Sequence, residues 1–149
     1  MSGTETSQGT RHRARHRARQ AAVQMLYQWE VGRHDIDEVL RTFWSADLPG
    51  SQGAPESVRT FAEQLVRVTI ANLEKIDPLI AETAEHWRLS RIAALDRIVL
   101  RLAIGEFLDG STPRNVVINE ALELAKTFSG EESVKFVNGI LDAVKKKMQ

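Results

Sequence analysis

The segment from Ile92 to Leu108 constrains the fold most, because it is apolar almost all the way round a helix. Only four charged residues interrupt it: Asp96, Arg97, Arg101 and Glu106. A helix without a continuous polar face has to pack against other elements on several sides at once. The segment therefore predicts a central, buried helix that other helices surround.

Apolar residues recur at steps of three and four in most of the remaining chain, which is the spacing of one face of a helix. Such stripes are found at residues 18–29, 36–43, 58–73, 116–128 and 134–144, and Asp35, just before the second stripe, has the form of a helix N-cap. The β-branched run Val116–Ile118 is short and leads into the strongly helical NEALELAK. We therefore expect an all-α fold with about seven helices.

Breaks in these patterns suggest how the chain is organised. Residues 1–10 are small and polar without periodicity, and we expect a disordered tail there. Leu48–Pro55 is rich in Gly and Pro, as loops are, and Asp77-Pro78 has the form of an N-cap with proline at the first helical position. The breaks predict one helical domain at 11–149, with an N-terminal bundle at about 11–75 and a C-terminal bundle at about 76–149.

Several function classes have no support in the composition. The chain contains no cysteine, no uncharged apolar run near the roughly 20 residues of a membrane span, and no secretory signal pattern. It has no Gly-rich phosphate loop and no recognisable nucleophile motif. We therefore expect a cytoplasmic protein that is not an enzyme and that binds neither a cofactor nor a metal ion. His12 and His16 are four residues apart, a spacing that can bind a metal ion on one helix face. Because arginines surround them and no third ligand follows, we interpret them as polar members of the basic repeat and not as metal ligands.

The net charge of zero hides a basic arm. Residues 1–20 carry a formal charge of +4 and the remaining residues carry −4. The arm, RHRARHRAR, continues without a breaker into an apolar helical stretch, so it should form the first turns of a helix. Arginines on a helix can bind nucleic-acid phosphates, often with two hydrogen bonds each, although such a run can also be a solvated surface. The acids that usually accompany a solvated run are absent here, which favours nucleic acid.

Two phenylalanines, Phe128 and Phe136, flank a short acidic break at 130–133. Either side chain can be part of the core, like Tyr27, Trp29 and Phe107. An aromatic side chain beside a loop can instead stack on an unpaired base, and a neighbouring carboxylate can accept a hydrogen bond from a base amino group. Spacing alone leaves both readings open.

Four stretches resemble the NusB family of bacterial transcription antitermination factors. They are RARQAAVQMLYQW at 17–29, DRIVLRLAIGEF at 96–107, VINEALELAKTF at 117–128 and ESVKFVNGILD at 132–142. They occur in the order and with the spacing of the family, between Arg15 and Val144. The resemblance implies two small helical bundles and a factor that binds boxA leader RNA of ribosomal RNA operons. It also implies action on RNA polymerase together with other Nus factors and with NusE, a small ribosomal subunit protein.

The resemblance also implies site residues. Arg15, Arg17 and Arg19 fall in the family's N-terminal RNA-binding motif, with His16 where arginine is usual in some members. Tyr27 and Asp96, the latter in place of the commoner glutamate, match positions that face NusE. The second part of the family's RNA surface matches Phe128, Glu132, Lys135 and Phe136, with Glu132 at a position where an aspartate can occur. Together with the rest of the arm, the expected RNA-binding set is Arg11, Arg13, Arg15, His16, Arg17, Arg19, Phe128, Glu132, Lys135 and Phe136.

Two other functions remain open at this stage. A NusB-like domain can belong to a ribosomal RNA modification system, which would require a cofactor-binding domain after the helical region. The chain can also be a non-catalytic protein–protein adaptor whose arm is only a tail. A test of RNA binding with the arm deleted distinguishes the two: an RNA factor loses binding with its arm, whereas an adaptor does not depend on RNA.

Overall fold

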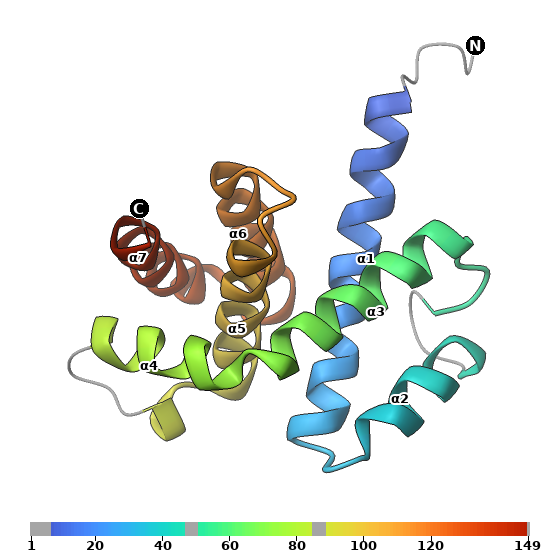
Figure 1. Ribbon diagram of the computed structural model, residues 1–149, viewed down its shortest axis with the longest axis horizontal. Helices are drawn as coiled ribbons and strands as arrows, with labels where there is room; N and C mark the ends of the chain where they lie inside the picture. The colour runs from blue at the N-terminus through green and yellow to red at the C-terminus, as the bar shows by residue number, and fades with distance from the viewer. Residues whose placement is uncertain (1–6, 47–50, 85–88, 149) are drawn as a thin grey trace. The chain divides into compact units, whose positions relative to one another are not determined.

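The computed structural model describes residues 7–46, 51–84 and 89–148, and these residues form helices without any strand. The α-helices are α1 (Ser7–Glu30), α2 (Ile36–Thr42), α3 (Glu56–Ala71), α4 (Leu73–Thr83), α5 (Ala94–Asp109), α6 (Arg114–Phe128) and α7 (Glu131–Lys147), drawn in Figure 1. Two short 3₁₀ helices, η2 (Phe43–Ser45) and η3 (Leu89–Arg91), follow α2 and precede α5. The all-α prediction is confirmed.

The chain divides into two compact units, residues 1–64 and 65–149. The boundary lies inside α3 and before the predicted division at 75/76. The predicted N-cap at Asp77 is wrong, because α4 already begins at Leu73 and runs through Pro78. Asp77 has a different role: its carboxylate forms two hydrogen bonds with the guanidinium of Arg101, at 2.9 and 3.0 Å.

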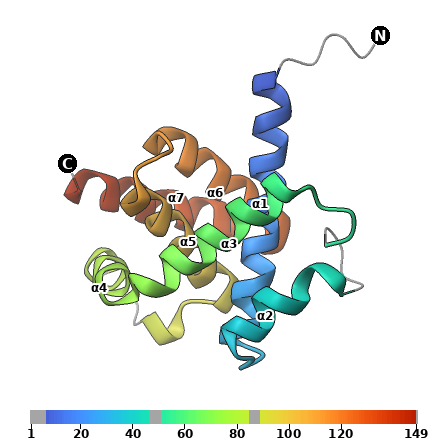
Figure 2. The same ribbon diagram turned by 45° about the vertical axis from the view of Figure 1, so that its right-hand side comes forward.

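The first unit is built on α1, α2 and the start of α3. Helix α1 begins at Ser7, so residues 7–10 are helical rather than part of a disordered tail, and residues 1–6 lie outside the described ranges. Asp35 caps α2 as predicted, with its Oδ2 atom 3.3 Å from the backbone nitrogen of Glu38. Helix α2 lies beside α1 (Figure 2). The apolar stripes of the three helices form the core, which includes Ala18, Ala22, Met25, Leu26, Val39, Leu40, Phe43, Val58, Phe61 and Ala62.

The second unit is organised around α5, as its sequence predicts. Its residues from Ile98 to Phe107 are buried with the exception of Arg101, because α4, α6 and α7 all pack against this helix. The helix ends at Gly110, whose φ of 77° lies in the left-handed region that favours glycine. Helices α6 and α7 also pack on each other, so α5, α6 and α7 form a continuous layer of contacts.

Candidate nucleic-acid interface

Helical geometry sorts the five arginines of the arm onto two faces of α1. Positions four apart on a helix lie on the same side. Arg11, Arg15 and Arg19 therefore share one face, and Arg13 and Arg17 share another. The arm is part of α1, as predicted, and each guanidinium is carried by a regular helix rather than by a flexible tail.

The face with Arg15 and Arg19 packs against an aromatic ring of α3. The Cζ atom of Arg15 lies 3.8 Å from the centroid of the Phe61 ring, and that of Arg19 lies 5.4 Å from it. Both distances are within the range of cation–π attraction. Arg19 is only 3% exposed, so its guanidinium is part of the packing, and a phosphate role for it conflicts with this burial. Arg15 is half-buried, so it can pack on the Phe61 ring and also contact a phosphate.

The other arm residues remain accessible. Arg11, His12 and Arg13 are exposed, and His16 and Arg17 are half-buried. Arg17 donates a hydrogen bond of 2.7 Å from Nη2 to the backbone carbonyl of Gln52, which fixes the direction of its side chain. Among the described residues, no group of three or more His, Asp or Glu side chains could hold a metal ion.

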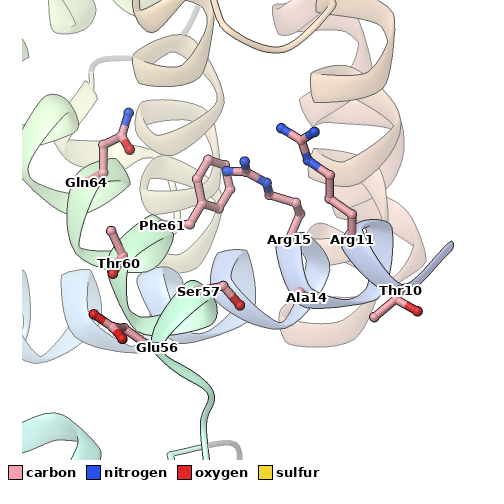
Figure 3. A pocket seen from close by; sticks show the side chains of 9 residues that line it. All are labelled: Thr10, Arg11, Ala14, Arg15, Glu56, Ser57, Thr60, Phe61 and Gln64. Carbon is pink, nitrogen blue, oxygen red and sulfur yellow. The ribbon is translucent and has the colours of Figure 1, made fainter. Parts of the chain in front are cut away.

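A cavity of about 650 Å³ lies between the N-terminal parts of α1 and α3, both within the first unit. Arg11 and Arg15 line it from α1, and Ser57, Thr60 and Gln64 line it from α3. Figure 3 shows the guanidinium of Arg15 in front of the Phe61 ring, with Arg11 extending on the same side of α1. The cavity could not be predicted from the sequence, because helical spacing gives no signal that α3 meets the arm.

In the second unit, the predicted RNA-binding residues lie where α6 ends and α7 begins. Phe128 is the last residue of α6 and is half-buried, as is Phe136 in the second turn of α7. Glu132 and Lys135 are exposed on the first turns of α7. The two aromatic rings are therefore neither fully core nor fully solvent-exposed, whereas Phe107 is a core residue at 4% exposure.

Asp96 occupies an unusual position in the first turn of α5. It is 8% exposed, and its Oδ1 atom accepts no hydrogen bond from the described residues. A cavity of about 280 Å³ is lined by Asp96, Phe136 and the segment Arg91–Ala93. A residue predicted to face a protein partner and one predicted to face RNA therefore share one cavity. Tyr27, the other predicted partner residue, is 41% exposed, although it was also a core candidate.

The model of the NusB family matches residues 16–146. The chain belongs to the NusB family. A relative from Koribacter versatilis described as transcription antitermination protein NusB is 45% identical over 141 residues, which cover 94% of this chain and 91% of the relative.

Solved NusB structures have the same fold. NusB from T. maritima is 38% identical, with a TM-score of 0.78 over 89% of this chain and 91% of that chain. A structure of the antitermination factors NusB and NusE in complex with double-stranded RNA matches at 26% identity, with a TM-score of 0.77 over 91% of this chain and 98% of the matched chain. The resemblance to NusB that four sequence stretches indicated is thus confirmed. No helix among the described residues is long and apolar enough to cross a membrane.

Proposed function

We propose that this chain is a cytoplasmic, non-catalytic transcription antitermination factor. It binds single-stranded boxA-type RNA of ribosomal RNA operons together with NusE and acts on RNA polymerase with other Nus factors, without a cofactor. Membership of the NusB family supports the proposal, as do the antitermination relatives and the matching complex of NusB with NusE and RNA.

The observation that carries the proposal is the arrangement of cations on α1. Four arginines at positions 11, 13, 15 and 17 are exposed or half-buried within about two turns of one helix. Arginine forms charge-assisted hydrogen bonds to phosphate oxygens, and a helix that carries several of them can follow an RNA backbone. We assign phosphate contacts to these four and place His16 beside them as a hydrogen-bond donor.

The end of α6 and the start of α7 supply the second half of the proposed RNA surface. Phe128 and Phe136 are exposed enough to stack on unpaired bases, a contact worth about 1–3 kcal/mol per base. Glu132 can accept a hydrogen bond from a base amino group, and Lys135 can contact a phosphate. Base contacts of this kind give sequence preference, which the arm does not provide.

The cavity around Asp96 is the site that we assign to NusE. An unpaired buried carboxylate oxygen costs free energy, because it has lost water without gaining a donor. Neighbouring arginines do not meet this need: Arg101 pairs with Asp77, and Arg97 donates to the carbonyl of Ile92 at 2.8 Å. A partner that inserts a hydrogen-bond donor would satisfy Oδ1. Tyr27 is the second residue that we assign to this partner.

Replacing Asp96 with alanine is expected to weaken NusE binding by about 2 kcal/mol or more, or roughly 30-fold, because the partner's donor loses a charged acceptor. The free energy of unfolding should not fall, because alanine removes a buried oxygen that makes no hydrogen bond in the free protein. Calorimetric titration with NusE and urea denaturation measure the two quantities. Asp142→Ala on α7, where the carboxylate is exposed, is the matched control. Unchanged NusE affinity for Asp96→Ala would remove this residue from the interface.

The choice between RNA factor and protein adaptor is tested by deleting residues 1–13. The deletion removes Arg11 and Arg13 but leaves Arg15 and Arg19 on Phe61. We expect weaker binding of boxA-type RNA and unchanged binding of NusE, both measured by fluorescence anisotropy. If the full-length and shortened chains bind NusE equally and neither binds RNA, the adaptor function is correct and the RNA function is wrong.

A further inference from the structure

The cavity between α1 and α3 has the size and lining of a small-ligand site. Its volume of about 650 Å³ falls within the roughly 300–1,000 Å³ that is typical of such sites. Two arginines line it from α1, and hydroxyl and amide side chains line it from α3. The Phe61 ring and Ala14 add apolar surface to this lining, so the cavity suits a ligand that combines a flat apolar group with a negative charge and polar edges.

Arg15 has one face of its guanidinium group already covered. Its Cζ atom is 3.8 Å from the Phe61 centroid, which is stacking distance, and Phe61 is itself only 5% exposed. The planar group is therefore held in place by a buried ring, while its remaining surface faces the cavity that it lines. Guanidinium planes of this kind stack on unpaired nucleic-acid bases.

The other lining groups complement a nucleotide. Arg11 is exposed one turn before Arg15 on the same face of α1, where it can contact a phosphate. Thr60 and Gln64 are one turn apart on α3 and carry groups that both donate and accept hydrogen bonds. The carboxylate of Glu56 also lines the cavity, but Figure 3 shows it pointing away from the two guanidinium groups. It therefore leaves the cationic end open to a phosphate.

We infer that this cavity is a subsite for one unpaired nucleotide of the bound RNA, with its base stacked on Arg15, its phosphate at Arg11 and its base edge at Gln64. The inference rests on the RNA-binding function proposed above and adds to it a place where α3 contributes to recognition. A single strand that follows the arm would place one base in the cavity between α1 and α3, in addition to the bases bound at α6 and α7.

The test combines Arg15→Lys with a scan of the RNA. Lysine keeps the charge but has no plane to stack, so it separates stacking from phosphate attraction. Single-stranded boxA-type oligonucleotides each carry one abasic nucleotide, which removes a base and leaves every phosphate. For the unaltered protein, we expect one abasic position at which affinity falls about 5- to 100-fold through lost stacking on Arg15. For Arg15→Lys, affinity for the intact RNA should fall by a similar factor, and the same abasic position should then have little further effect.

Two further variants sharpen the result. Gln64→Ala should weaken binding of the intact RNA about two- to tenfold, and this loss should also vanish for the RNA abasic at that position. Arg41→Lys on α2 makes the same chemical change at an exposed arginine outside the site and should alter nothing. Thermal melting of each variant checks that Arg15→Lys remains folded.

The outcomes distinguish this inference from the proposed function. If Arg15→Lys weakens all abasic oligonucleotides by the same factor, Arg15 contacts only phosphate and the subsite is wrong, although the RNA function stands. If the unaltered protein does not bind the RNA at all, the proposed function fails as well. If Arg15→Lys weakens binding of NusE and leaves RNA binding intact, the cavity holds a protein segment and the inference is overturned.

Discussion

Replacing Leu102 with alanine is expected to lower the free energy of unfolding by about 2–5 kcal/mol. Leu102 is 1% exposed and lies in the middle of α5, with buried residues before and after it. Because α4, α6 and α7 pack around this helix, none of them can move into the vacated space without losing contacts of its own. The lost transfer free energy and the remaining cavity therefore add. Urea denaturation followed by circular dichroism measures the change.

Two comparisons control this experiment. Leu102→Met keeps most of the volume and should cost less than about 1.5 kcal/mol. Leu108→Ala removes the same atoms from a half-buried position on the same helix and should cost clearly less than Leu102→Ala. A loss below about 1 kcal/mol for Leu102→Ala would mean that α5 is not the centre of the second unit.

Replacing Arg11, Arg13 and Arg17 together with glutamine is expected to weaken boxA-type RNA binding on the order of 100-fold at 0.1 M salt. Each phosphate neutralised on a single strand contributes about 0.7 to the slope of log affinity against log salt, which is roughly fivefold in affinity at that concentration. The loss should be similar for boxA-type and scrambled RNA, because phosphate contacts carry no sequence information. Fluorescence anisotropy with both RNAs measures it.

Arg41→Gln is the matched control for the arm, since it removes a positive charge from an exposed position on α2 of the same unit. We expect this variant to bind RNA almost as well as the unaltered protein. Equal losses for Arg41→Gln and for a single arm substitution such as Arg13→Gln would indicate attraction by overall charge. The arm would then have no specific place in the RNA surface.

Most of the fold could be predicted from the sequence because periodicity and local capping are short-range signals. The apolar stretch at 92–108 indicated the central helix, and Asp35 indicated the start of α2; both are confirmed. The error at Asp77 has a physical cause: an Asp-Pro pair has the form of a cap, but the carboxylate bonds to Arg101, 24 positions away. Sequence spacing does not reveal a partner that only the folded chain brings close.

The candidate site was predictable to a smaller extent, for the same reason. The arm is visible as a run of arginines, and the family resemblance pointed to Asp96 and Tyr27. The role of Phe61 could not be predicted, because its place on an apolar stripe says only that it is buried. The different exposure of Arg15 and Arg19 could not be predicted either: Arg19 lies farther from that ring than Arg15 and is nevertheless the more buried of the two. One member of the expected RNA-binding set, Arg19, is thereby better explained as part of the packing.

The salt dependence of RNA binding by the unaltered protein tests the central claim most directly. Four arm arginines that neutralise about four phosphates predict a slope of log affinity against log salt near −3, with about 0.7 per phosphate for a single strand. Between 50 and 200 mM salt, the affinity for boxA-type RNA should therefore fall about 50-fold. An affinity that stays constant over this range would contradict the account, because α1 would then hold no phosphates.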